Sequence, residues 1–357
     1  MKLAISVPIG AWHPFLPSAL ESLKAQGDSV RVALLDASGD ARVEALADSY
    51  DDMIAYRRHG PDGGQSDAIL EGWNALDGDW LGWLNADDML TPDAISHVKR
   101  QLNEDPSIDV IYGHSAILDE SSAMTGYHFN VEPPGPRLLT AGIISQPSCF
   151  FRRESYQKVG GLNPDLHYVM DWDLWIRLYQ SGAKFEFIDE CLSFVLWAKD
   201  TKTASLNRAR RAELNKLIAQ HAPEANQKPV FRDFIIHAVS DRLYPLCLRR
   251  KVQRRLRSVS GAPFGIRGDG LIMQEAAILF AHYGNRQMNA AEIRLGGEES
   301  ALGFDCSLGI RKVTKTKKFV RLDFDKPLQA GQVCKIGLNN PRQSAVYFQS
   351  AHWREEP

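Results

Sequence analysis

Short apolar runs alternate with amphipathic segments through the first part of the chain. The apolar runs are Leu3–Val7, Val30–Asp36, Met53–Arg57 and Trp80–Leu84, and the segments between them are Phe15–Gln26, Arg42–Ser49 and Asp67–Leu76. Those segments have helical spacing, and Trp80–Leu84 is apolar throughout, as a strand covered on both faces must be. Strands that alternate with helices predict a mostly parallel sheet with helices on both sides, which is an α/β fold.

The pattern is less regular after Val110. Strands are predicted at Val110–Tyr112, Ala116–Leu118, Phe185–Ile188 and Leu192–Leu196, and helices at Arg153–Val159, Asp171–Gln180 and Leu206–Ala219. The segment His221–Pro229 is polar and carries two prolines, which indicates a domain boundary.

Short segments separated by Gly, Asn and Pro residues follow from about Pro263 to the end of the chain. They include Ala277–His282, Glu292–Leu295, Phe319–Phe324, Val333–Leu338 and Ala345–Gln349. This pattern predicts a small β-sandwich-like domain. We therefore expect an α/β domain over residues 1–222, a basic helical linker over 223–262 and an accessory β-domain over 263–357.

Composition and charge narrow the class of protein. The formal net charge is −2, which does not indicate a nucleic-acid partner. The five cysteines are scattered, without a C-x-x-C pair or zinc-ligand spacing, so we expect reduced thiols in a cytoplasmic protein. The N-terminal segment MKLAISVPIG lacks the features of a signal peptide. No apolar stretch reaches the roughly 20 residues that span a bilayer.

A basic stretch precedes the predicted accessory domain. Seven Lys or Arg residues and no carboxylate lie between Arg242 and Arg257, and apolar residues recur at helical spacing as far as Val259. A basic amphipathic helix over residues 242–259 would suit the peripheral surface of an anionic membrane. It would equally suit a linker helix that packs its apolar stripe on the first domain and leaves its charges solvated.

The sequence Asn85-Ala86-Asp87-Asp88 follows the buried run Trp80–Leu84 directly. Ligands of open α/β sheets bind at the carboxyl ends of strands, so these side chains lie where a site is expected. Mg²⁺ or Mn²⁺ bound to a diphosphate needs only one or two protein carboxylates. Asp residues also favour a turn or a helix cap, and this segment alone does not decide between the two interpretations.

A second acidic cluster is Met170-Asp171-Trp172-Asp173-Leu174-Trp175. A carboxylate in a walled pocket can act as a general base, and an adjacent Trp can stack on a sugar ring. The alternative is that Asp171 is a helix N-cap and that Asp173 favours the helix dipole from the first turn.

The Gly-rich segment Pro61–Ala68 precedes a predicted helix, so its amides could bind a phosphate. It is neither a Walker loop nor a G-x-G-x-x-G fingerprint, which argues against an ATPase or a classical dehydrogenase.

Taken in order, these motifs resemble those of family-2 glycosyltransferases with the GT-A fold, over roughly residues 1–205. The matching elements are Val7-Pro8, Asp36, Pro-Asp-x-Gly-Gln-Ser-Asp-Ala at 61–68, Gly-Trp-Leu-Asn-x-Asp-Asp at 82–88, Gln-Pro at 146–147, Phe-Phe-Arg-Arg at 150–153, Val-Gly-Gly at 159–161 and Met-Asp-Trp-Asp-Leu-Trp at 170–175. The resemblance implies a metal-dependent, inverting transfer of a sugar from a nucleotide-diphosphate donor to a glycan or lipid-linked acceptor, in bacterial surface polysaccharide synthesis.

The resemblance also implies roles for individual residues. Asp171 corresponds to the catalytic base, and Asp87, with Asp88 as a second ligand, to the metal site. The nucleotide-sugar site would comprise Pro8, Asp36, Asp62, Gly64, Asp67, Asn85 and Ala86, and the acceptor or sugar site Gln146, Trp172 and Asp173.

Four departures from the family pattern stand out. Asn85 replaces the first Asp of the signature. Gly63 stands where an Arg is common and Leu70 where an Asn is common, and Trp197 lies near the place of a frequent His. The changes at Asn85, Leu70 and Trp197 leave open a non-catalytic protein that binds a glycan or a nucleotide sugar. A nucleotidyltransferase ranks lower, because Ile9–Pro14 offers no basic residue for a triphosphate.

Overall fold

The computed structural model describes residues 1–128, 134–197, 208–223, 262–283, 287–297 and 302–355. The chain divides into two compact units. The first comprises the described residues of Met1–His114, Asn130–Val195 and Ser205–Arg232, and the second those of Ser115–Phe129, Leu196–Ala204 and Asp233–Pro357. The basic segment 242–259 lies outside the described residues, so its contact with a membrane stays a prediction.

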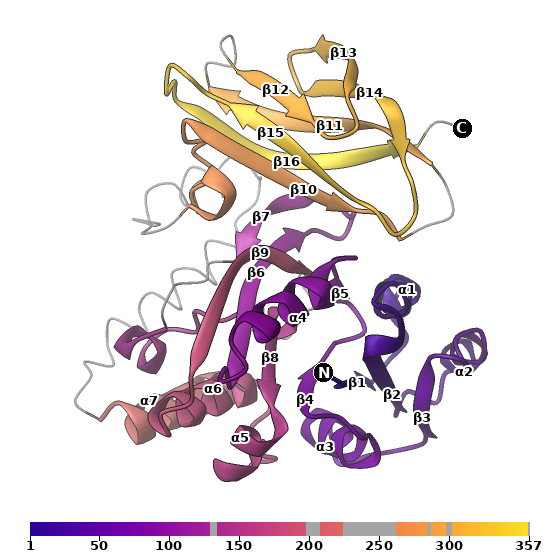
Figure 1. Cartoon of the computed structure of the whole chain (residues 1–357), viewed down its shortest axis with the longest axis vertical. Helices are drawn as coiled ribbons and strands as arrows, with labels where there is room; N and C mark the ends of the chain where they lie inside the picture. The colour runs from indigo at the N-terminus through magenta and orange to yellow at the C-terminus, as the bar shows by residue number, and fades with distance from the viewer. Residues whose placement is uncertain (129–133, 198–207, 224–261, 284–286, 298–301, 356–357) are drawn as a thin grey trace. The chain divides into compact units, whose positions relative to one another are not determined.

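The first unit is built on a mixed sheet with the strand order β6-β8-β4-β1-β2-β3 (Figure 1). Parallel pairing joins β1 to β2 and β4, and β2 to β3, whereas β8 runs antiparallel to β4 and β6. These strands are β1 (Leu3–Ile9), β2 (Val30–Asp36), β3 (Ile54–His59), β4 (Trp80–Trp83), β6 (Val110–Leu118) and β8 (Cys149–Arg152). A short strand β5 (Met89–Leu90) pairs with β9 (Phe185–Leu196).

Helices cover both faces of this sheet, as the α/β pattern predicted. Alternate residues of β1 pack into one buried cluster with α1 (Leu16–Lys24), α2 (Ala41–Asp48) and α4 (Ala94–Glu104). The opposite face carries α3 (Gln65–Ala75), which approaches so closely that a Cβ on Gly72 would lie 2.4 Å from the Ser6 Oγ. The remaining helices of this unit are α5 (Arg153–Lys158), α6 (Met170–Gln180) and α7 (Arg208–His221).

Two long strands replace pairs of shorter ones that the pattern predicted. Polar residues interrupt the apolar run inside β6, but the structure buries them: His114 is 4% exposed and Ser115 is fully buried. The Nε2 of the His114 side chain lies 2.9 Å from the Oδ1 of Asp189. A strand can therefore continue through polar positions when partners far along the chain satisfy them.

The second unit consists of two antiparallel sheets, β13-β14-β11-β16-β7 and β10-β15-β12, which Figure 1 draws largely in orange and yellow. The strands are β7 (Met124–His128), β10 (Glu275–Ala281), β11 (Met288–Gly297), β12 (Gly303–Cys306), β13 (Ile310–Lys315), β14 (Val320–Leu328), β15 (Val333–Asn339) and β16 (Val346–Glu355). The rings of Phe280 and Trp353, one from each sheet, lie 4.1 Å apart. The prediction of a β-sandwich-like unit is in line with this packing.

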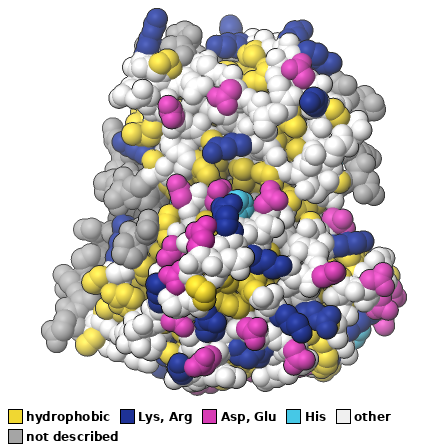
Figure 2. All heavy atoms as spheres, in the orientation of Figure 1, with side chains coloured by type: hydrophobic (Ala, Val, Ile, Leu, Met, Phe, Trp, Pro, Cys, Tyr) yellow, Lys and Arg dark blue, Asp and Glu magenta, His cyan; other side chains and the backbone are white. Residues whose placement is uncertain are grey.

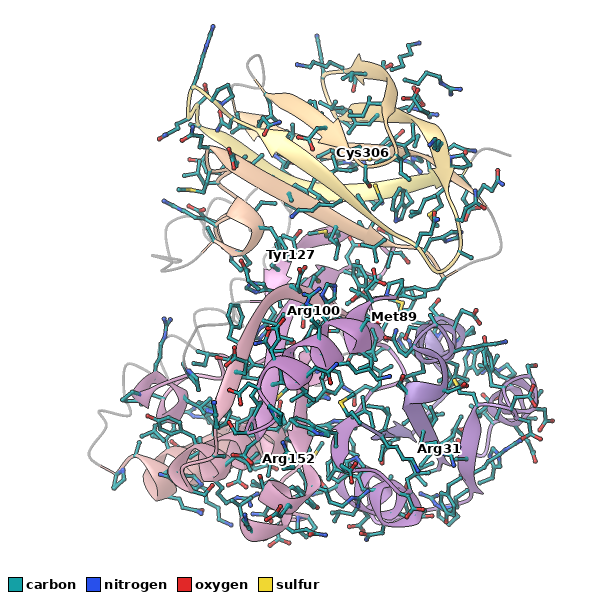
Figure 3. The ribbon with its side chains drawn as sticks, viewed as in Figure 1. Arg31, Met89, Arg100, Tyr127, Arg152 and Cys306 are labelled. Carbon is teal, nitrogen blue, oxygen red and sulfur yellow. The ribbon has the colours of Figure 1, made fainter. Side chains whose placement is uncertain are left out.

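The units do not divide where the predicted domain boundary lies. Met124 of β7 pairs with Ala351 of β16. The Oη of Tyr127, which Figure 3 labels, donates a hydrogen bond to the Ala277 carbonyl at 2.9 Å. Residues 115–128, which include the last four residues of β6 and all of β7, were expected in the α/β domain but group with the C-terminal strands.

Both signs of charge are interspersed on the face shown in Figure 2. That distribution matches a net charge of −2 without a single-sign field on this face. None of the described helices combines the length and the apolar character that crossing a bilayer requires.

Candidate active site

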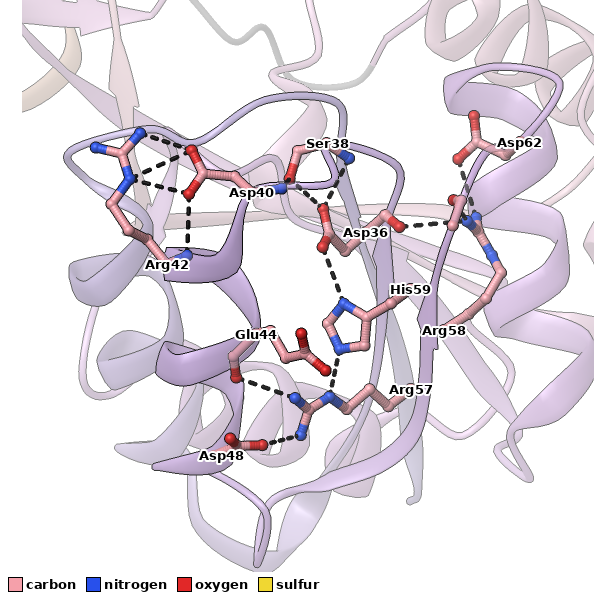
Figure 4. A network of polar contacts seen from close by, with 11 residues as sticks. Asp36, Ser38, Asp40, Arg42, Glu44, Asp48, Arg57, Arg58, His59 and Asp62 are labelled. Atoms are coloured by element: carbon pink, nitrogen blue, oxygen red, sulfur yellow. Dashed lines mark hydrogen bonds and ion pairs between the residues drawn. The ribbon is translucent and has the colours of Figure 1, made fainter.

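Asp36, the predicted contact to the nucleotide base, ends β2 and is 2% exposed. Its Oδ1 accepts hydrogen bonds from the backbone N–H and the hydroxyl of Ser38, at 2.9 and 2.5 Å (Figure 4). Its Oδ2 lies 2.9 Å from the Nδ1 of His59, whose Nε2 accepts a hydrogen bond from the Arg57 Nε. The ring therefore carries its proton on Nδ1 and donates it to Asp36, which holds the plane of the carboxylate in place.

The Gly-rich segment forms the entry to α3. Gly64 is the residue before the helix and has a φ of 122°, a conformation that favours glycine. Asp62 accepts a hydrogen bond from the Gly64 N–H and pairs with Arg58, both at 2.9 Å. A Cβ on Gly63 would lie 1.8 Å from the Asp67 Oδ2, so a larger side chain at position 63 would fit only if Asp67 moved.

Asn85 is the centre of a polar cluster. Its Oδ1 accepts a hydrogen bond from the Gln65 Nε2 at 2.8 Å, and its Nδ2 donates to the Asp88 Oδ2 at 2.9 Å and to the Gln146 Oε1 at 3.2 Å. The Gln146 Nε2 in turn donates to the Trp83 carbonyl at 2.7 Å. The structure thus brings together three predicted site residues, and it adds Gln65, which the sequence interpretation quoted within its motif but assigned no role.

This cluster supplies a physical reason for Asn at position 85. An amide can accept from Gln65 and donate to Asp88 at the same time. A carboxylate at the same place would face the Asp88 carboxylate and the Gln146 carbonyl oxygen with no proton to share, and like charges at this distance repel. Asn85 is therefore matched to its neighbours rather than a random loss of the signature Asp.

Asp87, the predicted metal ligand, is half-buried, and burial raises the pKa of its carboxyl group while the charge of His13 opposes the rise. Among the described residues, no side chain forms a hydrogen bond or an ion pair with this carboxylate. The His13 Nδ1 accepts a hydrogen bond from the Phe15 N–H at 3.2 Å. No sequence motif includes His13, and only its placement by the fold connects it to Asp87.

Asp87 and Asp88 suit a metal ion that also takes ligands from a bound phosphate and water better than one held by protein ligands alone. Within the described ranges, no group of three or more His, Cys, Asp or Glu side chains could hold a metal on its own. Asp87 is a desolvated carboxylate without a cationic side-chain partner in that part of the chain, and the neighbouring Asp88 is 4% exposed. One or two carboxylate ligands suit Mg²⁺ or Mn²⁺ that takes its other ligands from phosphates and water.

Asp171 is the second residue of α6. The residue before the helix is Val169, so the interpretation of Asp171 as an N-cap is wrong. Its Oδ1 accepts the N–H of Trp172 at 2.8 Å. Burial raises the pKa of Asp171, and the backbone hydrogen bond and the charge of Arg210 on α7 partly oppose the rise. A carboxyl group with a raised pKa is a better match to proton transfer near neutral pH.

Trp172 and Asp173 have different surroundings. The Trp172 Nε1 donates to the Leu138 carbonyl at 2.6 Å, which anchors the half-buried ring. Asp173 is 2% exposed, and both its oxygens are engaged, one by Arg177 at 2.8 Å and the other by His221 at 3.1 Å. Asp173 therefore joins α6 to α7, and we correct its predicted contact with the sugar to a structural role.

The two motifs that lie a hundred residues apart in the chain meet at their helix N-termini. The Ser66 Oγ, in the first turn of α3, lies 3.2 Å from the Leu166 carbonyl and 3.0 Å from the Met170 Sδ at the start of α6. The Gly-rich segment and the acidic cluster around Asp171 are consequently neighbours in the fold.

Known glycosyltransferases resemble this chain in sequence and in fold. Residues 12–160 match the sequence model of glycosyl transferase family 2. An uncharacterized glycosyltransferase of Haemophilus influenzae is 25% identical over 252 residues, which are 68% of this chain and 84% of that protein. A PGL/p-HBAD biosynthesis glycosyltransferase of Mycobacterium bovis is 28% identical over 174 residues, 47% of this chain and 66% of that protein.

Among solved structures, residues 1–349 of S. aureus TarS in complex with UDP-GlcNAc resemble this chain with a TM-score of 0.51. The match covers 72% of this chain and 80% of that one, at 13% sequence identity. The likeness confirms the predicted GT-A fold, and at this identity it bears on the fold alone.

Proposed function

The chain contains a glycosyltransferase domain of family 2, and we propose that this domain moves a sugar from a nucleoside diphosphate to a hydroxyl group of a glycan or lipid-linked acceptor, with inversion. The observation that carries the proposal is the contact of Ser66 with Met170, since it joins the N-termini of α3 and α6. A phosphate-binding segment and the carboxylate of Asp171 then share one site.

The donor would lie across the loops that follow β1, β2 and β4. Asp36 and Pro8 would border the base, and Asn85 with Ala86 would meet the ribose. The first N–H groups of α3 have no partners within the helix and suit a diphosphate. Asp62 and Asp67 flank the same segment.

A divalent cation follows from the charge of this site. Four carboxylates, those of Asp62, Asp67, Asp87 and Asp88, lie on the segments proposed to meet the diphosphate, and they would repel it if no cation intervened. Asp87 would hold Mg²⁺ or Mn²⁺, with Asp88 as a second ligand. When bound, the ion would supply positive charge to the leaving diphosphate.

Asp171 would take the proton of the acceptor hydroxyl as that oxygen forms its bond to the anomeric carbon. The bond from the anomeric carbon to the diphosphate oxygen breaks in the same displacement, which inverts the centre. Arg210 would keep part of the Asp171 population ionised, because its charge lowers the pKa that burial raises. Gln146 and Trp172 would orient the sugar or the acceptor.

The acceptor class rests on the resemblance, and the named role of the M. bovis relative in PGL/p-HBAD biosynthesis supports it. A place in bacterial surface polysaccharide synthesis, on the cytoplasmic side of the membrane, is part of the same proposal.

The first experiment is a thermal-shift panel of UDP-, GDP- and dTDP-sugars, with and without Mn²⁺. A ligand at about 100 times its Kd should add about 2.7 kcal/mol to the free energy of unfolding. We expect one donor to give a metal-dependent shift. No shift with any donor, from folded protein, would favour the non-catalytic binding protein.

Asp171→Asn then separates binding from chemistry. The variant should keep the donor shift and lose transfer and donor hydrolysis, by about 10²–10⁴-fold for a lost general base. Asp165→Asn, an exposed change on the loop before α6, is the control that should keep activity. Full turnover of Asp171→Asn would show that another base operates.

A further inference from the structure

Two cysteines far apart in the sequence meet in the second unit. Cys306 ends β12, and Cys334 is the second residue of β15, the strand with which β12 pairs (Figure 3). Cys306 lies opposite Ile336, so Cys334, two residues away, is on the same face of the sheet. The two Sγ atoms lie 3.2 Å apart.

The two thiols differ in access and in acidity. Cys334 is fully buried, whereas Cys306 is half-buried and within reach of a reagent. The hydrogen bond with Cys334 lowers the pKa of Cys306 to about 7, since it stabilises the thiolate, and the Leu308 N–H also points at this sulfur at 3.5 Å. The same hydrogen bond raises the pKa of Cys334. The accessible sulfur of Cys306 is therefore the nucleophile, and the buried sulfur of Cys334 is the thiol that can react with it afterwards.

The other described cysteines lack this arrangement. Cys149 and Cys191 are 1% and 5% exposed, and burial raises the pKa of Cys149 well above its ordinary value. They resemble inert core thiols. The fifth cysteine, Cys247, lies outside the described residues.

We propose that Cys306 and Cys334 form a redox-active dithiol, which low-molecular-weight disulfides oxidise to a disulfide within the second unit. This modification site is independent of the proposed transfer reaction. A disulfide needs the sulfurs at about 2.05 Å, so they must close by a little over an ångström. The bond would link β12 to β15 covalently and close a loop of the chain that includes β13 and β14.

The reaction balances in two steps of thiol–disulfide exchange. The Cys306 thiolate attacks one sulfur of oxidised glutathione, the S–S bond of the reagent breaks, and one glutathione thiolate leaves. Cys334 then loses its proton to solvent and attacks the Cys306 sulfur of the mixed disulfide. The second glutathione leaves, and two electrons have passed from the protein to the reagent.

The test uses the full chain, treated with oxidised glutathione, alkylated, and analysed by intact mass and peptide mapping. We expect the loss of two hydrogens, two fewer alkylated thiols, and one cross-linked peptide pair that contains Cys306 and Cys334. Reduced glutathione should reverse the product. A Cys306 that stays fully alkylated after treatment would overturn the proposal, and this readout needs no variant.

Three variants assign the order of events. Cys334→Ser should stop at one glutathionyl group on Cys306, and Cys306→Ser should take up none at Cys334. Cys247→Ser is the matched control and should cross-link like the wild type. A cross-link that requires Cys247, or a Cys334→Ser protein that gains no glutathionyl group while its melting temperature is that of the wild type, would contradict the pairing.

Discussion

The buried cluster of Asp173, Arg177 and His221 ties α6, which carries Asp171, to α7, which carries Arg210. The Arg177 Nε donates to the Asp173 Oδ2 at 2.8 Å, and the His221 Nε2 lies 3.1 Å from Oδ1. The side chain of Asp173 is 3% exposed and that of His221 is 6% exposed. Replacing Asp173 with Ala would leave a guanidinium without its partner in this interior.

Removing one member of a buried ion pair costs about 3–5 kcal/mol of the free energy of unfolding. In a domain of this size each kcal/mol lowers the melting temperature by about 2–4 °C, so Asp173→Ala should melt about 6–20 °C below the wild type. Asp173→Asn keeps the shape of the side chain and removes only its charge, so its melting temperature should fall by less than that of Asp173→Ala. Differential scanning fluorimetry at neutral pH measures both, with the exposed Asp165→Ala as a control that should melt like the wild type.

The pH dependence adds a second test of the same cluster. Burial by itself would raise the pKa of Asp173, but hydrogen bonds from His221 and Arg177 outweigh it and leave the pKa below its usual value. A carboxyl group with a lowered folded pKa contributes stability above its unfolded pKa of about 3.9, and that stability is lost as the pH falls through the folded value. The difference between wild type and Asp173→Ala should therefore hold near neutral pH and narrow below about pH 4.

A contact of Asp173 with the acceptor would give a different result. If Asp173→Ala melts with the wild type but raises KM for the acceptor, the side chain contacts the sugar after all. The structural role that we assign to it would then be wrong, and the original interpretation of the motif would be right.

Three further predictions concern the site itself. Burial raises the pKa of Asp171, so ionising this carboxyl group costs the folded state stability as the pH rises through that pKa. Asp171→Asn should therefore have a melting temperature at or above that of the wild type at pH 7. A lower melting temperature of the variant would mean that the fold stabilises the charge. Arg210→Gln removes a charge that lowers the pKa of Asp171, so the acid limb of the plot of kcat against pH should move to higher pH. An acid limb at the wild-type pH would mean that another residue is the base. Asn85→Asp sets a carboxylate against Asp88, so the free energy of unfolding should fall by about 1–3 kcal/mol in EDTA and recover when Mn²⁺ is added. An equal loss of stability with and without Mn²⁺ would count against a metal at this place.

Local sequence pattern predicted most of the backbone. The strand Val30–Asp36 is found with the predicted bounds, and the helix predicted at Phe15–Gln26 is α1, one or two residues shorter at each end. The helix α4 was missed, although Ala94, Ile95, Val98 and Leu102 are buried at helical spacing. This spacing is a local signal that the sequence itself carries.

The division into units could not be found in the same way. The place of β7 beside β16 depends on the pairing of Met124 with Ala351, more than two hundred residues later. Strand pairing of this kind has no local signature, because hydrogen bonds between backbones are the same for every residue type.

Local sequence pattern was enough to identify the candidate residues for the chemistry: the carboxylates after the buried strand, the Gly-rich entry to a helix, and the acid at the start of α6. Which of them meet depends on long-range packing. Asn85 is joined to Gln146, Asp173 to His221, and Cys306 to Cys334. The physical reason is that periodicity and turn chemistry act within a few residues, whereas a side chain's partners, its burial and therefore its pKa depend on what the rest of the chain packs against it.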